Sequence, residues 1–162
     1  MQLPEWAPNL HPLLIHFPIV LLIAAVLFDT AGLFMKKNSW LQKASLILYL
    51  FGTIGVVAAV LSGDAAKESL NIPNAVAPHV EHHEEWAETT LYFFVIYTAA
   101  RLLIFFFMNS LRKAFLVIAV LIGYVGLYFL YETGDHGAEL VYGYGLGTKT
   151  YSGQTHEHSG EH

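Results

Sequence analysis

The sequence predicts an all-α integral membrane protein, a four-helix bundle made of two antiparallel hairpins with both termini outside. Two observations predict this fold. Of the 162 residues, 55% are hydrophobic and only 13% are charged, which is too apolar for a soluble domain of this length. Four apolar segments are also long enough to cross about 30 Å of hydrocarbon, which takes roughly 20 helical residues each. They cover residues 12–35, 41–63, 85–108 and 111–132.

The sequence contains no cysteine, which excludes disulfides, thiolate-bound metals, iron–sulfur clusters and covalent c-type haem attachment. Any metal must therefore be held by nitrogen and oxygen. Neither Lys nor Arg precedes Lys36, so the first apolar segment lacks the basic start of a cleaved signal peptide. We expect it to remain as a helix.

Short turns join the first segment to the second (MKKNSW) and the third to the fourth (NSLRK), so each pair is expected to form a tight hairpin. A longer connection, residues 64–83, is expected to join the two hairpins. Positive charge favours the cytoplasmic side of a membrane, and the basic residues gather at the two short turns: Lys36, Lys37, Lys43, Arg112 and Lys113. Only Lys67 and Lys149 lie on the other side, which predicts that both termini lie outside.

This orientation places all nine histidines at or beyond the outer surface: His11, His16, His79, His82, His83, His136, His156, His158 and His162. Carboxylates of the helix ends lie on the same side, among them Glu81, Glu84, Glu85, Glu88, Glu132, Asp135 and Glu139. The sequence therefore predicts an outward-facing cap rich in histidine and carboxylate on a membrane bundle.

The first apolar segment begins LHPLLIHFPIVLL, with two imidazoles at membrane depth. An ionisable group there is costly and is a functional hypothesis by default. Pro12 suits the first helical position, where its missing N–H costs nothing, so His11 is expected at the helix start. His16 lies about 140° further around an ideal helix, beside the bend expected at Pro18. The alternative is that both imidazoles only form hydrogen bonds within the bundle.

The segment PHVEHHEEWAE is expected to begin the third helix after Pro78. His79 and His83 share a face, at a spacing with which helical imidazoles ligate a metal ion or present one imidazole to a haem iron. The predicted metal ligands are His79, His83, Glu85 and Glu88, and the predicted cofactor ligands are His11, His16, His79, His82, His83 and His136. A solvated polar helix end is the alternative reading. Because the first and third helices both start with histidine on one side, we expect their imidazoles to meet.

Two charged residues, Asp29 and Arg101, fall inside the membrane. At 1.5 Å per residue, both lie roughly 10 to 12 Å from the helix ends nearest the basic turns. Since a buried unpaired charge is costly, they are expected to pair between the first and third helices, in an architectural role. In the alternative, Arg101 reaches to the headgroups and Asp29 bonds a hydroxyl.

Small residues recur along one face of the second segment, at Gly52, Gly55, Ala59 and Gly63. Such a stripe lets a neighbouring helix approach closely, and Gly123 with Gly126 is expected to do the same in the fourth segment. We interpret these glycines as packing positions.

The segment GDHGAELVYGYGLG follows the fourth helix and carries His136. Its glycines allow a tight fold over the end of the bundle, with Leu140, Val141 and Tyr142 packing down as a lid. Residues 149–162 are polar and low in complexity, which predicts a disordered tail whose three histidines bind metal weakly or remain solvated. The predicted organisation is one transmembrane domain, 1–148, followed by this tail.

The motifs LHPLLIHFPIVLL, SGDAAKESL and HGAELVYGYGLG, with the histidine-bearing start of the third helix, resemble the bacterial DUF2231 membrane domain over about residues 8–148. The resemblance implies a small four-helix domain of the bacterial inner membrane, with the His-rich face outside. Such domains are also joined to cytochrome-like or Rieske-like domains. By position it points to His11, His16, one of the helix-three histidines, and His136. The chain departs from the family pattern at Tyr144, where a second histidine is often expected.

Three functions remain open from the sequence. The first is a redox-accessory or electron-transfer component with b-type haem between His11 or His16 and a helix-three histidine. The second is a Zn- or Cu-type metal protein, and the third is a cofactor-free structural subunit or assembly factor. No hydrolase or transferase motif is present, which argues against an enzyme. The expected partners are the lipid bilayer and a redox protein or larger membrane complex, not nucleic acid.

Overall fold

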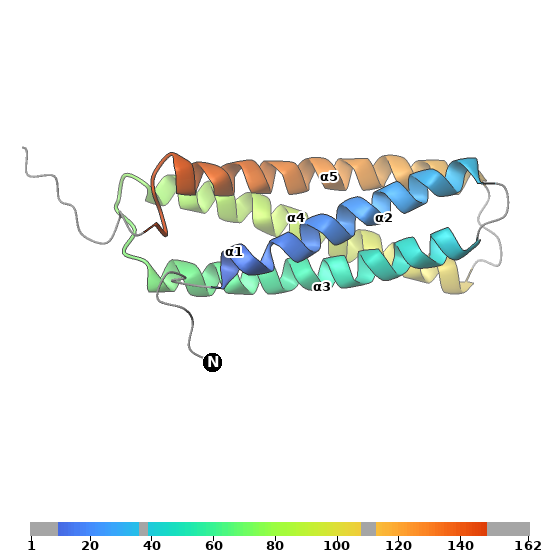
Figure 1. Ribbon diagram of the computed structural model, residues 1–162, viewed down its shortest axis with the longest axis horizontal. Helices are drawn as coiled ribbons and strands as arrows, with labels where there is room; N and C mark the ends of the chain where they lie inside the picture. Colours follow the sequence, from blue (N-terminus) through green and yellow to red (C-terminus); the bar gives the residue numbers. More distant parts are fainter. Residues whose placement is uncertain (1–9, 36–38, 108–112, 149–162) are drawn as a thin grey trace, which may run out of the picture.

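The computed structural model describes residues 10–35, 39–107 and 113–148, which form five helices (Figure 1). A short helix α1 leads directly into α2, and three long helices follow. Their bounds are His11–Leu14 for α1, His16–Phe34 for α2, Ser39–Ser69 for α3, Ala77–Phe107 for α4 and Lys113–Tyr142 for α5. Four spans, the first made of α1 and α2 together, are long and apolar enough to cross a membrane. The predicted all-α membrane fold is confirmed.

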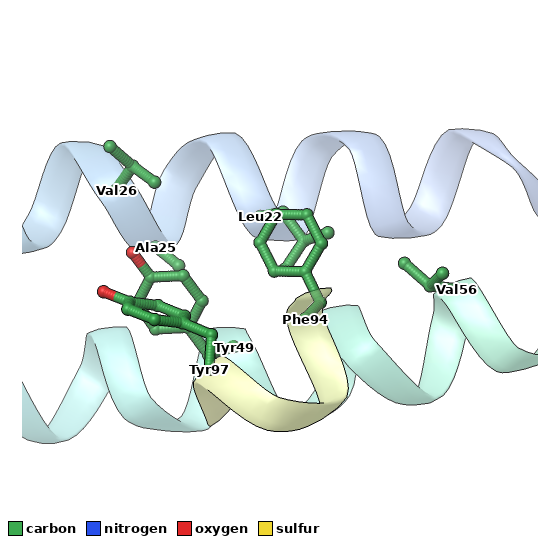
Figure 2. Packing of buried hydrophobic residues seen from close by; sticks show 7 residues of the cluster. All are labelled: Leu22, Ala25, Val26, Tyr49, Val56, Phe94 and Tyr97. Carbon is green, nitrogen blue, oxygen red and sulfur yellow. The ribbon is translucent and has the colours of Figure 1, made fainter. Parts of the chain in front are cut away.

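The four long helices form a closed ring. Helix α2 packs on α3 and α5, and α4 packs on the same two helices, while α1 rests on α3. The centre of the bundle is filled by side chains from three helices (Figure 2): Leu22, Ala25, Val26, Tyr49, Val56, Phe94 and Tyr97. Large apolar side chains also cover the outside, as at Val20 (64% exposed) and Ile96 (69%). Such a surface suits contact with lipid chains.

The predicted small-residue stripe forms the contact between α3 and the first span. A Cβ on Gly52 would lie 2.7 Å from Leu22, and one on Gly55 would lie 3.1 Å from Pro18. On α5, a Cβ on Gly126 would overlap the ring of Phe93. These glycines therefore allow close helix approach, as expected.

The helices extend well beyond the predicted segments at the end that carries the histidines. The connection is shorter than the expected 64–83, because α3 runs to Ser69. Helix α4 begins at Ala77, within two residues of the start predicted after Pro78. An ion pair of 2.7 Å between Lys67 and Glu84 joins the two extensions. Helices of 30 or 31 residues span about 45 Å, so their ends project past a hydrocarbon layer of about 30 Å.

The fourth span ends later than predicted. The lid expected from Leu140, Val141 and Tyr142 over the end of the bundle is not formed in that way. Helix α5 continues to Tyr142, a side chain that is 89% exposed instead of packed down. Leu140 is buried, but as part of the helix, and Val141 is exposed. After Tyr142, Gly145 takes a left-handed φ of +67° and the chain turns back. Leu146 thereby joins Leu140, Val76 and Val80 in a second apolar cluster.

Candidate functional site

The first span is interrupted between its two histidines. Helix α1 ends at Leu14 and α2 begins at His16, because Pro18 has no N–H to donate to the carbonyl of Leu14. His11 lies partly buried against α3, whereas His16 is exposed. Of the two candidate cofactor ligands in this span, only His11 therefore turns toward α3, since a turn of roughly 140° carries His16 to the outer face.

His11 is held by α3. Its Nδ1 lies 2.9 Å from the carbonyl oxygen of Ala59 and 3.0 Å from Oγ of Ser62. The hydroxyl of Ser62 also donates to the carbonyl of Ala59, at 2.8 Å. A Cβ on Gly63 would lie 3.3 Å from Cε1 of His11. Gly63, the last glycine of the stripe, therefore leaves the space in which this imidazole packs against α3.

His83 on α4 is the second imidazole turned inward. It lies near enough to His11 and His136 for electrostatic interaction, and its ring is beside the backbone of Thr133. A Cβ on Gly137 would lie 3.1 Å from Cε1 of His83, so this ring also rests on a glycine of a neighbouring helix. Its Nδ1 is buried and has no hydrogen-bond partner within the described part of the chain, a property shared there only with the Tyr49 hydroxyl.

His79, one turn further out, contacts the C-terminal turn. The hydroxyl of Tyr144 lies 2.8 Å from Nε2 of His79, and the two rings are 4.4 Å apart at their centroids. Nδ1 of His79 also faces the carboxylate of Glu139 at 3.6 Å. Tyr144 therefore fixes the turn to α4, a contact that the sequence analysis did not identify.

His82 and His136 form an aromatic group with Trp86, in which the indole stacks on His136 and meets His82 edge to face. The two imidazole centroids are 4.3 Å apart, and the indole N–H of Trp86 points to Nε2 of His82 at 3.3 Å. His136 also lies 3.8 Å from carboxylate oxygens of both Glu132 and Glu139. Both imidazoles thus have aromatic neighbours, and His136 has carboxylate neighbours as well.

The structure does not gather the four predicted metal ligands, His79, His83, Glu85 and Glu88. The side chains of Glu85 and Glu88 are exposed, while His79 contacts the C-terminal turn and His83 lies inside. Across residues 10–35, 39–107 and 113–148, no three His, Asp or Glu side chains are arranged to hold a metal ion. The histidines of the tail lie outside the described residues.

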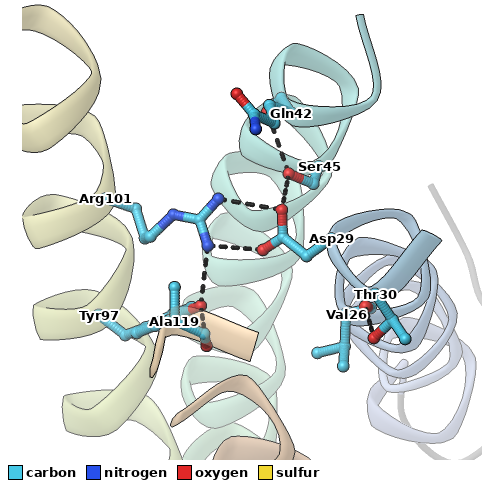
Figure 3. A network of polar contacts seen from close by, with 8 residues as sticks. All are labelled: Val26, Asp29, Thr30, Gln42, Ser45, Tyr97, Arg101 and Ala119. Atoms are coloured by element: carbon cyan, nitrogen blue, oxygen red, sulfur yellow. Dashed lines mark hydrogen bonds and ion pairs between the residues drawn. The ribbon is translucent and has the colours of Figure 1, made fainter. Parts of the chain in front are cut away.

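At the opposite end of the bundle, Asp29 and Arg101 form the expected ion pair (Figure 3). The guanidinium reaches both carboxylate oxygens, with Nη1 at 2.5 Å from Oδ2 and Nη2 at 3.0 Å from Oδ1. Ser45 donates to Oδ1 at 2.6 Å, and Nη1 of Arg101 lies 3.1 Å from the Tyr97 hydroxyl. Opposite charges at matching depth predicted the pair, but nothing in the sequence pattern singled out Ser45 or Tyr97.

A family model described as "Predicted membrane protein (DUF2231)" matches residues 7–150. No curated protein and no solved structure matches the chain.

Proposed function

This chain belongs to the DUF2231 family of predicted membrane proteins, and we propose that it serves as a redox-accessory component, with His11 and His83 as ligands to a transition metal. The observation that carries this proposal is the buried Nδ1 of His83, which has no hydrogen-bond partner among the described residues. A buried polar atom left unpaired costs about 1–3 kcal/mol. Ligation to a metal would remove this cost.

The arrangement of His11 supports the same role. Hydrogen bonds at one ring nitrogen orient metal-ligating histidines in general, and Nδ1 of His11 is held in this way by Ala59 and Ser62. Both imidazoles rest on glycines of the next helix, Gly63 and Gly137. The two rings are thus positioned by backbone contacts, which preserve their orientation better than flexible side chains do.

The number of imidazoles favours haem iron over a bare ion. Zinc generally takes about four protein ligands in a closed site, and the described residues offer no group of three. Haem needs only axial ligands from the protein, and His11 with His83 would supply two. A bound haem would contribute one-electron transfer. The protein would hold it at the His-bearing end of the bundle, through α1 and α4.

A cofactor-free structural subunit or assembly factor is the second candidate, and a specific observation favours it. Most imidazoles of the cap already contact protein groups, as His79 does with Tyr144 and His82 does with Trp86. On this reading the histidines only hold the C-terminal turn and the helix extensions together.

An absorbance spectrum of the purified full-length protein separates the two candidates. The protein is produced in cells supplied with a haem precursor, and spectra are recorded before and after dithionite, alongside elemental analysis for Fe, Cu and Zn. The proposal predicts a Soret band, or one equivalent of bound metal, that His83→Ala removes. His16→Ala is the matched control, because this exposed imidazole should be dispensable. A folded protein with neither haem nor metal would support the cofactor-free role.

A further inference from the structure

We propose that the C-terminal turn, residues 143–148, opens and closes over the imidazole of His83 and so controls the access of solutes to it. In the closed form, which this structure shows, the turn covers the end of the bundle that carries the histidines. Opening admits the metal or haem of the candidate site. We rest this on the proposed function, since the turn regulates the same site, but opening can be measured without any cofactor.

The C-terminal turn contributes to the layer of side chains directly beyond His83. The ring of His83 on α4 rests on Gly137 of α5. Three residues away on each helix, in the direction of the bundle end, lie the buried side chains of Val80 and Leu140. This spacing places them about 4.5 Å further out. They pack in one apolar cluster with Leu146 of the turn, so this cluster covers the layer that holds His83.

The closed form is held by contacts between the turn and the two helices. After α5 the chain folds back toward α4 (Figure 1). The N–H of Leu146 donates to the carbonyl of Leu140 at 2.9 Å, and its side chain is only 8% exposed. The hydroxyl of Tyr144 lies 2.8 Å from Nε2 of His79. The turn is thus joined to α5 by its backbone and to α4 by an aromatic side chain.

This turn can open while the helices stay in place. It is anchored through Leu146 and Tyr144, and a segment that buries so little apolar surface opens at a free energy well below that of global unfolding. Gly145 and Gly147 have left-handed φ angles of +67° and +77°, a conformation that glycine adopts at no steric cost. The closed form therefore depends on glycine, and a side chain at Gly145 should shift the turn toward the open form.

Thiol labelling measures access to the site directly, because the chain contains no cysteine. His83→Cys reports on the covered position, and Ala138→Cys, at an exposed position of α5, gives the rate without cover. The purified full-length protein is labelled with a charged maleimide, with and without Gly145→Ala. A Cβ at a left-handed φ strains the closed turn. We therefore expect labelling at position 83 to become about 5- to 30-fold faster, and labelling at position 138 to stay unchanged.

Gly134→Ala is the matched control, because it makes the same change on α5 at a position where a Cβ meets nothing within 4 Å. It should leave the rate at position 83 unchanged. Leu146→Ala, which removes the buried side chain of the turn, should accelerate labelling as well and remains informative where Gly145→Ala does not fold. Circular dichroism verifies that each variant keeps its helices.

Equal labelling rates at positions 83 and 138 in the chain with an unaltered turn overturn the proposal, because the turn then covers nothing. An unchanged rate at position 83 in the folded turn variants also overturns it, since solutes then enter by another route. Acceleration by Gly134→Ala as large as that by Gly145→Ala overturns it as well. The absence of haem and metal from the purified protein would refute the redox role alone, because these rates are measured without either.

Discussion

Replacement of Asp29 by Asn should destabilise the bundle by about 3–5 kcal/mol, the usual cost of breaking a buried ion pair from one side. The side chain of Asp29 is fully buried and that of Arg101 is 5% exposed. The substitution leaves the guanidinium charge in the interior, where no other carboxylate is within salt-bridge distance among the described residues. It also weakens the acceptor for the Ser45 hydroxyl, now 2.6 Å from Oδ1.

Reversible unfolding of the purified protein in mixed detergent micelles with increasing SDS, followed by circular dichroism, measures this loss. Asp29→Asn, Arg101→Gln and the double variant together form a cycle, and the double variant should lose less than the sum of the two single changes, by about 0.5–3 kcal/mol. Thr30→Ala is the matched control. Its hydroxyl bonds the carbonyl of Val26 in the same helix at 2.8 Å, so the loss should be about 1 kcal/mol. Strictly additive losses in the cycle would refute a direct pair.

Three further predictions concern packing, the C-terminal turn and topology. Gly126→Val should cost about 1–3 kcal/mol in the same unfolding assay, because a Cβ at this position overlaps the ring of Phe93 on α4. Gly134→Ala should not destabilise the protein, because nothing lies within 4 Å of a Cβ there. Tyr144→Phe removes the 2.8 Å contact to the α4 imidazole, and should raise amide exchange in the turn about fivefold, equivalent to a hydrogen bond of about 1 kcal/mol; unchanged exchange contradicts that role. A cysteine at Ser159 should react with an impermeant thiol reagent in intact cells and one at Asn38 should not, since the sequence predicts both termini outside; equal labelling of the two contradicts the orientation.

Hydropathy predicted the number of spans but not where the helices end. The spans are detected because lipid demands about 20 consecutive apolar residues. Beyond the hydrocarbon this constraint disappears, and polar stretches such as residues 64–69 and 77–84 continue as helix. Tertiary contacts hold these helix extensions in place. They are the ion pair between Lys67 and Glu84 and the apolar cluster around Val80. Contacts between segments distant in sequence leave no periodic signal in either segment.

The pair Asp29–Arg101 was predictable for a physical reason that does not extend to the histidines. Inside the membrane, a charge has few ways to be satisfied, so depth and sign alone identify its partner. Near the membrane surface an imidazole can interact with water, with aromatic rings or with carboxylates, so its position in the sequence does not identify one partner. A helical spacing of four residues therefore did not decide what His79 and His83 contact. The first meets Tyr144 of the C-terminal turn, and the second lies against Gly137.

The carboxylate of Asp29 is more completely satisfied by hydrogen bonds than the imidazole of His83, and this difference supports the candidate site. Both oxygens of Asp29 accept hydrogen bonds from Arg101, and one accepts a further bond from Ser45, so this network requires no added ligand and is architectural. At the other end, α1 supplies His11 and α4 supplies His83, whose buried Nδ1 has no hydrogen-bond partner in the described residues. An unpaired buried nitrogen reduces stability. Packing alone does not account for the unpaired Nδ1 of His83 in the same region as the oriented imidazole of His11, whereas binding of a ligand would. A ligand of the proposed site would therefore bind at the end of the bundle that carries His11 and His83, and its removal should leave the ion pair of Asp29 and Arg101 intact.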